Sequence, residues 1–460
     1  MAAVVTLSPP TSALGPRPAP VVAVRDAGHL PSVTLPTNYL KRKFLLFAPF
    51  CDQGLGVQAR AYLGWLGELG YGACVFASAS SKAAARAGAT PDRFQAAPSE
   101  WEPPEGVDVQ YSPQTRERVQ PQEVAAYATE QGVTDALILE PAHLNCFRVA
   151  AALYAQTECR VWAVPNLEMV RREELVVKQY YDKEVFAGVL CHNDYAVETL
   201  RYFRPLLVDR IKVLPFALPA TEPWLGGPVP LSTPYDGYGP LRFLLVGGLN
   251  AVVRKQADKV CAAFARAGGN ATLTVLTQKP EPSLLRFSRD QRYRIVAKHF
   301  SHEHILQAYA THHVVLFLSR AEGIGLAMHE ALRAGCAMVT LKHRMYTHMV
   351  CDGVTGRVVA AVKEAGKSGA KAIGNDDPVV HTYTFDVDAL ATVLGDLMRH
   401  PQQVASMQLR ARQSFETVFA PSQVTKAWRS ALRVNAESGR PEPMEPGARS
   451  KFDLQPGFRG

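Results

Sequence analysis

The stretch "HVVLFLSRAEGIGLAMHEALRAGCAMVTL", residues 313–341, reads as one strand–helix–strand unit. The apolar run "HVVLFLS" predicts a buried strand, and "CAMVTL" predicts a second one. Between them we expect a helix from near Gly325 to Gly335, because glycine is favoured just beyond a helix C-terminus. Buried strands joined by a helix are the repeating unit of a doubly wound parallel sheet.

The same alternation of short apolar runs and helical patterns extends along both halves of the chain. Strands are predicted in the first half at "KFLLFAPF", "GACVFAS", "DALILE", "RVWAVP", "FAGVLC" and "IKVLPF". In the second half they are predicted at "LRFLLVGG", "ATLTVLT", "YRIVAKHF", "HVVLFLS", "CAMVTL" and "GRVVAAV". We therefore expect an α/β protein with two Rossmann-like domains that face each other across a cleft. Ligands of such sheets bind beyond the carboxyl ends of the strands.

Proline-rich segments mark the expected boundaries. We expect a disordered tail over residues 1–38, a first domain over 39–217 and a linker over 218–240. A second domain is expected over 241–400, followed by helices over 401–436 and a disordered tail over 437–460. Residues 363–378, "KEAGKSGAKAIGNDDP", are expected to form a surface insertion in the second domain.

Bulk composition is that of a globular protein, with 460 residues, 47% hydrophobic and 20% charged. No apolar run is long enough for a transmembrane helix. The eight cysteines are isolated, which favours reduced core thiols and a cytoplasmic compartment. A transit segment at the N-terminus stays open as an alternative to the disordered tail. The net charge of +8 favours anionic partners, but no nucleic-acid-binding motif accompanies it, so we expect none to bind.

Two glutamates stand eight positions apart in the opening stretch. Glu322 is expected in the loop after the first strand, and Glu330 inside the following helix. Both carboxylates could then lie at the ligand-binding edge of the sheet and accept hydrogen bonds from hydroxyl groups, as sugars and ribose require. The alternative for each residue is an ordinary solvated glutamate.

Two glycine-containing turns follow predicted strands. Gly247 and Gly248 end one strand, and Arg254 and Lys255 are expected at the start of the next helix. Free N–H groups at a helix start, together with two cations, suit a diphosphate. In the first half, Gly54 and Gly56 are expected to form a flexible turn before a helix. Plain strand-to-helix loops are the alternative for both.

Five histidines crowd residues 299–313: His299, His302, His304, His312 and His313. They straddle a predicted strand, a loop and a helix, without the i, i+4 spacing of a helical zinc site. We therefore expect structural roles for them and no metal site.

These features together resemble a known family. The segments "SRAEGIGLAMHEALRAGCAMVTL", residues 319–341, and "DGVTGRVV", residues 352–359, are similar to the E-x7-E and DGxTG motifs of GT-B glycosyltransferases. The family in question is the retaining, nucleotide-sugar-dependent family four, the glycosyl transferases group 1. "FLLVGGLNAVVRKQADKVCAAF", "GLGVQARAYLGWLGELGY" and "HEHILQAYATHHVVLFLSRAEG" resemble further parts of it. The resemblance covers roughly residues 43–435 and implies that the C-terminal helices pack back on the first domain.

The resemblance also implies roles for individual residues. Glu322 would hold the hydroxyls of the transferred sugar, and Glu330 those of the nucleotide ribose. Arg254 and Lys255 would bind the diphosphate and stabilise the leaving group. The remaining donor-binding residues would be Gly54, Gly56, Gly247, Gly323, Ile324, Gly325 and Leu326.

The sequence departs from the family pattern at two places. Gly248 stands where the family usually has an arginine, so Arg254 would substitute for it. Many family members carry a histidine after the fourth or fifth strand of the first domain, whereas here that segment reads "VWAVPNLEM" and offers Asn166 and Glu168 instead. His143, in "LEPAHLN", is a second candidate for a catalytic role there.

The expected function is metal-independent transfer of a sugar from a nucleotide-diphosphate sugar to a hydroxyl acceptor on a glycan, lipid or protein, with retention. No tightly bound cofactor is expected, and a peripheral membrane contact stays open. The alternative is a catalytically silent GT-B-like sugar- or nucleotide-binding module of a larger assembly.

Overall fold

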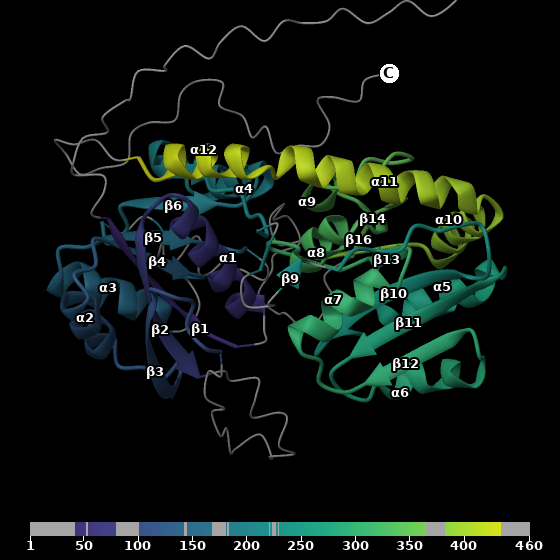
Figure 1. Ribbon diagram of the computed structural model, residues 1–460, viewed down its shortest axis with the longest axis horizontal. Helices are drawn as coiled ribbons and strands as arrows, with labels where there is room; N and C mark the ends of the chain where they lie inside the picture. The colour runs from purple at the N-terminus through teal and green to yellow at the C-terminus, as the bar shows by residue number, and fades with distance from the viewer. Residues whose placement is uncertain are drawn as a thin grey trace, which may run out of the picture. The chain divides into compact units, whose positions relative to one another are not determined.

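The computed structural model describes residues 42–51, 54–79, 101–141, 145–167, 181, 184–219, 221–222, 227–228, 230–364 and 382–433. Figure 1 shows its two main sheets and the helices around them. The expected tails, His143 and Glu168 lie outside these residues, as do parts of the expected linker and insertion.

The first sheet has seven strands, all parallel, in the order β3-β2-β1-β4-β5-β6-β7. Its strands are β1 (Lys43–Pro49), β2 (Gly72–Ala79), β3 (Asp108–Thr115), β4 (Asp135–Leu139), β5 (Arg160–Val164), β6 (Gly188–Cys191) and β7 (Ile211–Val213). The helices between them are α1 (Gly54–Glu68), α2 (Pro121–Glu130), α3 (Cys146–Gln156), α4 (Asp194–Phe203) and the 3₁₀ helix η5 (Pro205–Arg210).

The second sheet has six parallel strands in the order β12-β11-β10-β13-β14-β15. They are β10 (Leu241–Gly248), β11 (Ala271–Thr277), β12 (Tyr293–Ala297), β13 (Val314–Phe317), β14 (Ala337–Lys342) and β15 (Gly356–Ala360). The accompanying helices are α5 (Ala257–Ala267), α6 (Pro282–Leu285), η7 (Arg286–Arg289), α7 (His302–Ala310), α8 (Leu326–Ala334) and α9 (Arg344–Thr347). Two short antiparallel pairs are β8 (Thr221–Glu222) with β9 (Gly227–Pro228), and β16 (Val362–Lys363) with β17 (Tyr383–Thr384).

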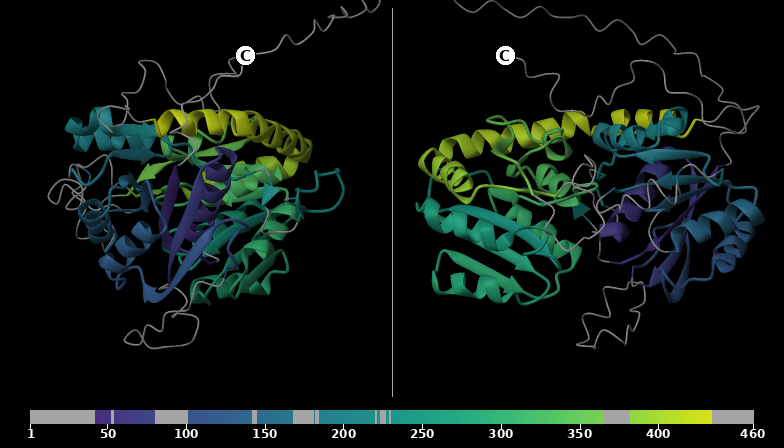
Figure 2. Two further views of the ribbon diagram at one scale, coloured as in Figure 1. Left: turned by 60° about the vertical axis from the view of Figure 1, so that its left-hand side comes forward. Right: turned by 180° about the vertical axis from the view of Figure 1, so that it is seen from behind.

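The predicted pair of Rossmann-like sheets is thus confirmed. Both faces of the first sheet are buried, because neighbouring residues of β1 enter different hydrophobic clusters. Phe44 and Leu46 belong to one cluster, and Leu45 and Phe47 to the other. Strands buried on both faces read as continuous apolar runs, which is why the sequence revealed them. Helices lie on both faces of each sheet (Figures 1 and 2).

The strand β3 was not predicted. Its sequence, "DVQYSPQT", is polar, and most of its side chains are exposed. It pairs on one side with β2 and ends the sheet. An edge strand tolerates Pro113 and polar side chains because half of its backbone groups are not needed for pairing.

The C-terminal helices are α10 (Val387–Arg399), α11 (Pro401–Val418) and α12 (Pro421–Ala431). Helix α11 contacts α8 and β14 of the second sheet, whereas α12 contacts α1 and β7 of the first. The indole of Trp428 in α12 donates a hydrogen bond to the Pro215 carbonyl, at 3.2 Å. The prediction that these helices return to the first domain is confirmed.

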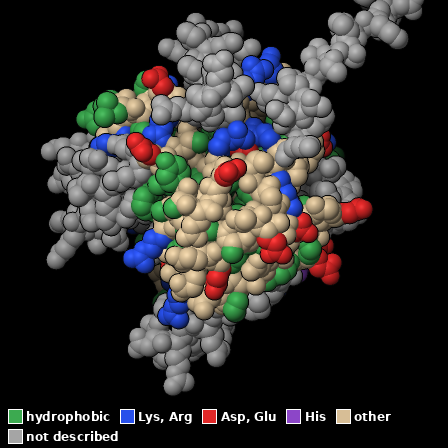
Figure 3. Space-filling model, turned by 90° about the vertical axis from the view of Figure 1, so that its left-hand side faces the viewer, with side chains coloured by type: hydrophobic (Ala, Val, Ile, Leu, Met, Phe, Trp, Pro, Cys, Tyr) green, Lys and Arg blue, Asp and Glu red, His purple; other side chains and the backbone are tan. Residues whose placement is uncertain are grey.

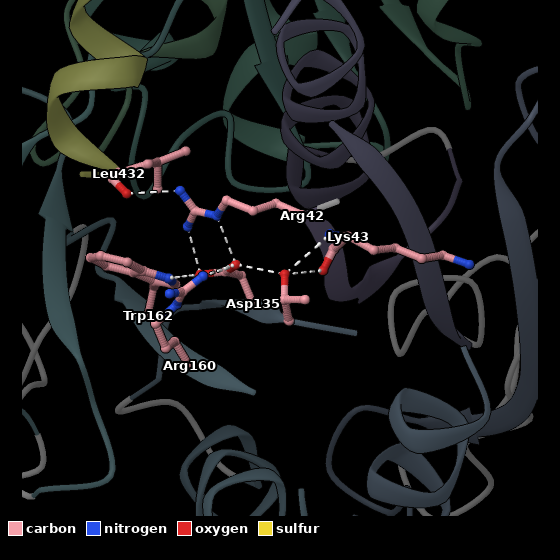
Figure 4. A network of polar contacts seen from close by, with 7 residues as sticks. Arg42, Lys43, Asp135, Arg160, Trp162 and Leu432 are labelled. Atoms are coloured by element: carbon pink, nitrogen blue, oxygen red, sulfur yellow. Dashed lines mark hydrogen bonds and ion pairs between the residues drawn. The ribbon is translucent and has the colours of Figure 1, made fainter. Parts of the chain in front are cut away.

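A buried ion-pair network holds the end of α12 (Figure 4). The Asp135 carboxylate accepts hydrogen bonds from Arg42, Arg160 and Trp162. Arg42 also donates to the carbonyl of Leu432, at 2.8 Å, just beyond α12. The network lies at the amino ends of β1, β4 and β5, the opposite edge of the sheet from the one where ligands are expected.

All eight cysteines are free thiols. Of the helices in the described part of the chain, none has the length and apolar character to cross a membrane. Lys and Arg side chains lie beside Asp and Glu side chains on the face shown in Figure 3.

Candidate active site

Two cations and one carboxylate meet where β10 and β13 end. The Lys255 ammonium donates a hydrogen bond to Oε1 of Glu322, and the Arg254 guanidinium lies 3.6 Å from the same oxygen. Lys255 also lies over the ring of Phe317, 4.4 Å from its centroid. Glu322 and Lys255 are buried, at 6% and 8% exposed. The predicted grouping of these three residues is present in the structure.

The charge states of Lys255 and Glu322 follow from their burial and from their attraction for each other. Burial, reinforced by Arg254, lowers the pKa of Lys255 to about 8, against the opposing effect of Glu322. Burial would raise the pKa of Glu322, but the attraction of Lys255 and Arg254 outweighs it and lowers that pKa below its ordinary value. Both groups are therefore charged near neutral pH, and the ion pair is preformed.

Backbone contacts fix the loop that carries the two cations. The Arg320 N–H donates to the Arg254 carbonyl at 2.8 Å, and the Gln256 side chain donates to the Leu318 carbonyl at 2.7 Å. Gln256 has a left-handed backbone, φ 55°, immediately before α5. Arg254 and Lys255 consequently precede the helix by two or more residues, so their predicted place at its start was slightly wrong.

Helix α8 begins and ends at glycines, as predicted. Gly325 and Gly335 flank it with φ of 71° and 81°, in the left-handed region that favours glycine. Leu326 is its first residue, and the N–H groups of Met328 and His329 donate to the Gly325 carbonyl, at 2.7 and 3.3 Å. Ile324, just before the helix, is partly buried against the hydrophobic core.

Gly323 lies where a loop of the second sheet touches a loop of the first. A side chain at this position would collide with the backbone oxygen of Asn166, and its Cβ would lie 2.8 Å from the Asn166 carbonyl carbon. Asn166 follows β5 of the first sheet. The structure therefore places the loop of Glu322 directly against the residue that the sequence singled out in the first domain.

Asn166 belongs to a closed ring of hydrogen bonds, which we call the amide–imidazole ring. Asn166 Nδ2 donates to Gln58 Oε1 at 3.1 Å, and Gln58 Nε2 donates to the Tyr62 hydroxyl at 3.2 Å. The Tyr62 hydroxyl lies 3.4 Å from His192 Nδ1, and His192 Nε2 lies 3.0 Å from Asn166 Oδ1. Because an amide oxygen only accepts, the closer contact assigns the imidazole proton to Nε2, which leaves Nδ1, also 3.4 Å from the Leu214 carbonyl, to accept from Tyr62.

The imidazole of the ring is neutral. Burial lowers the pKa of His192 to about 4, which keeps it neutral at ordinary pH. Sequence reasoning missed Gln58, Tyr62 and His192. The signal for His192 was its position directly after the predicted strand "FAGVLC", where a polar side chain faces the binding edge.

Glu330 is buried in α8 and already has two partners. His302 Nε2 lies 2.8 Å from one carboxylate oxygen, and the Tyr309 hydroxyl donates to the other at 2.9 Å. It is not a solvated helix glutamate, since it is only 3% exposed.

The predicted glycines have different surroundings. Gly54 and Gly56 lie in the first turn of α1, so the predicted flexible turn was wrong. At Gly56 a Cβ would lie 3.2 Å from the Cys51 carbonyl carbon, and at Gly247 a Cβ would lie 3.1 Å from Ala251 Cα. Close backbone packing therefore requires glycine at both positions, whereas Gly54 has open space around it.

Three residues other than glycine have positive φ in the described part of the chain: Glu140, Leu167 and Gln256. Glu140 directly follows β4, Leu167 follows β5 and Asn166, and Gln256 follows Lys255. Such strain costs on the order of 1–3 kcal/mol per residue and concentrates at functional sites. The positions of these three strained residues support placing the active site at the carboxyl ends of the strands.

The clustered histidines do not assemble a metal site in the described residues, where no group of three or more His, Cys, Asp or Glu side chains is placed to hold an ion. His302 contacts Glu330, and His312 lies 2.8 Å from the hydroxyl of Thr274. His313 is 3.1 Å from the Arg242 N–H.

Residues 240–374 match the family model described as glycosyl transferases group 1. We refer to this part of the chain, by that similarity, as the glycosyl transferases group 1 domain. It contains Arg254, Lys255, Glu322 and Glu330, together with the loop of Gly323. No curated protein matches the chain in sequence.

Solved structures extend the likeness beyond the glycosyl transferases group 1 domain to the first sheet. A glycosyltransferase from Rickettsia africae has a TM-score of 0.57 at 10% identity, over 86% of this chain and 100% of that one. Sucrose-phosphate synthase from Thermosynechococcus elongatus has a TM-score of 0.57 at 14% identity, over 84% and 97%. HepE from Anabaena, in complex with UDP and glucose, has a TM-score of 0.56 at 14% identity, over 85% and 99%. The chain therefore has the GT-B fold.

Proposed function

We propose that this protein is a metal-independent, retaining glycosyltransferase of family four, which moves a sugar from a nucleotide-diphosphate sugar to a hydroxyl acceptor. The observation that carries the proposal is the meeting of Arg254, Lys255 and Glu322 at the strand ends of the glycosyl transferases group 1 domain. HepE is described with UDP and glucose, and the pneumococcal O-GlcNAc transferase GtfA with UDP and GlcNAc. Uridine diphosphate sugars are therefore the first donors to test.

The proposed chemistry is electrostatic. As the bond between the sugar and the diphosphate breaks, negative charge builds on the departing phosphate oxygen. Lys255 and Arg254 would neutralise that charge, in a buried setting where such interactions are strong. The acceptor oxygen would form the new bond to the sugar, and its proton would pass to the departing diphosphate.

Glu322 would exchange partners when the donor binds. In the free protein its carboxylate neutralises Lys255 and Arg254. A diphosphate would compete for those cations and leave the carboxylate to accept hydrogen bonds from the sugar hydroxyls. Glu330 would accept from the ribose, and the backbone amides of Gly323 to Leu326 would contact the sugar or its phosphates.

We assign residues 241–400 to the donor domain and residues 39–217 to the acceptor domain. The amide–imidazole ring places Asn166 against the donor loop, which supports Asn166 as the contribution of the first domain. The acceptor would be a glycan, lipid or protein hydroxyl.

The test is incubation with UDP-, GDP- and ADP-sugars and a panel of sugar, lipid and peptide acceptors, with release of the nucleoside diphosphate as the signal. We expect turnover of at least one donor. Glu322→Gln should lower kcat by about 100-fold or more, because a neutral amide accepts hydrogen bonds from the sugar hydroxyls more weakly than a carboxylate does. Lys426→Gln, on the exposed side of α12, is the matched surface control.

Two results would overturn the proposal. Binding of a nucleotide sugar without release would identify a binding module instead of an enzyme. Absence of both binding and release across the whole panel would remove the donor site altogether.

A further inference from the structure

Helix α7 presents two side chains to one buried carboxylate. His302 stands in its first turn and Tyr309 seven residues later, a spacing that places both on the same face of a helix. That face packs against α8, where Glu330 is the fifth residue. His302 Nε2 reaches one carboxylate oxygen and the Tyr309 hydroxyl reaches the other, at 2.8 and 2.9 Å.

The start of α7 is itself fixed. The Ser301 hydroxyl caps the helix by accepting from the N–H of His304. This cap sets where the first turn begins, and hence where the imidazole of His302 lies. Tyr309 is completely buried, so its ring has little freedom to move.

The two bonds leave part of the carboxylate available. A carboxylate offers about four acceptor positions, two on each oxygen. His302 and Tyr309 occupy one on each, so one position remains on each oxygen. Burial and the neighbouring Glu330 raise the pKa of Tyr309 well above its ordinary value, so Tyr309 is a neutral phenol that donates its proton to the carboxylate.

A pair of acceptor positions held in one plane matches a pair of neighbouring hydroxyls. We propose that His302 and Tyr309 are positioning residues that fix the Glu330 carboxylate so that its remaining lone pairs receive the 2′- and 3′-hydroxyls of the donor ribose. This inference rests on the proposed function of the donor site. It adds that α7 confers selectivity for ribonucleotides over deoxyribonucleotides through Glu330.

A purely structural role predicts something different. If the two side chains only satisfied a buried carboxylate, their removal would weaken the fold and all nucleotides would lose affinity alike. A positioning role predicts that the loss falls on nucleotides that carry the 2′-hydroxyl.

Calorimetry can separate the two roles without any need for turnover. The probes are UDP and 2′-deoxy-UDP, with the GDP and ADP pairs in parallel. The unmodified protein should prefer the ribonucleotide by about 10-fold or more, the effect expected of a hydrogen bond to a charged group. In Tyr309→Phe and His302→Gln the preference should fall to about 3-fold or less, while affinity for the deoxynucleotide stays nearly constant. With a nucleotide-sugar substrate, KM should rise and kcat should change little.

Matched controls come from the same domain. Tyr293→Phe removes another largely buried hydroxyl, which donates to the Cys261 carbonyl at 2.9 Å. Gln307→Ala changes an exposed side chain of α7. Both controls should keep the full ribose preference, and thermal melting would verify that every variant is folded.

The outcomes distinguish this inference from the function on which it rests. If variants lose both nucleotides in parallel, or keep the full preference, the positioning role is wrong and the donor site stands. If the unmodified protein binds none of the three ribonucleotides, the donor site is wrong and the inference falls with it.

Discussion

At the scale of single residues, Gly323 lies where a side chain has no room. Its neighbour across the contact is backbone, the carbonyl of Asn166, and not the end of a flexible side chain. The amide–imidazole ring holds Asn166 from the other side, so neither partner can move aside freely. The glycine is therefore needed for the approach of the two sheets at the site, and not for a left-handed turn.

Gly323→Ala should accordingly separate the donor loop from Asn166. We expect kcat/KM for the donor to fall by about 10- to 100-fold, because displacement of positioned groups by about 1 Å has an effect of that order. The unfolding free energy should fall by about 1–3 kcal/mol, the usual cost of an overpacked site. Steady-state kinetics and urea unfolding would measure the two effects.

Gly67→Ala is the control for this substitution. Gly67 lies in α1, with open space where a Cβ would stand, so alanine there should stabilise the helix by about 0.5–1 kcal/mol. If Gly323→Ala behaved like Gly67→Ala, the contact with Asn166 would not matter.

At the scale of elements, apolar strands and glycine-ended helices could be predicted, and polar elements could not. Strands β1 and β10 are continuous apolar runs, whereas β3 carries its polar side chains into solvent at the sheet edge. That Lys255 and Glu322 lie at the same edge of the second sheet could be predicted, because each follows a predicted strand, but their ion pair could not. Neither could the amide–imidazole ring, because it joins α1 to the residues after β5 and β6, which only tertiary packing brings together.

The end of helix α12 is held by residues that lie close to it in space but far from it in the sequence. Arg42 joins Asp135 at the amino end of β4 to the carbonyl of Leu432 (Figure 4). Arg42→Met should lower the unfolding free energy by about 3 kcal/mol, because it leaves a buried carboxylate with fewer partners. Amide hydrogen exchange should accelerate in α12 more than in α10.

A surface ion pair provides the comparison for Arg42. Arg266 and Asp388 pair at 2.6 Å but are mostly exposed, so Arg266→Met should cost no more than about 1 kcal/mol. Equal exchange rates of α12 in the Arg42 variant and the unmodified protein would contradict the link.

At the scale of the whole molecule, one hydrophobic cluster extends from the first sheet into the second. It includes Phe44 and Trp65 from the first half, Phe243 and Leu316 from the second, and Trp428 of α12. Phe216 and His329 also meet across the halves, with ring centroids 4.9 Å apart. Because the two sheets share a core, we expect them to unfold together, so that a single unfolding free energy describes the chain.

That free energy should decrease in mild acid because of His192. Its pKa is about 4 in the folded protein and near 6.5 when unfolded, so the unfolded chain binds the proton more readily between these values. As pH falls from 6.5 to 4, this residue alone should remove about 3 kcal/mol of stability, since each pKa unit corresponds to about 1.4 kcal/mol. His192→Gln lacks the titrating group, so its unfolding free energy should decline less by that amount. Urea unfolding at pH 7, 6, 5 and 4.5 measures the difference, with exposed His304→Gln as control. Parallel pH curves for the His192 variant and the unmodified protein would show that folding does not lower the pKa of His192.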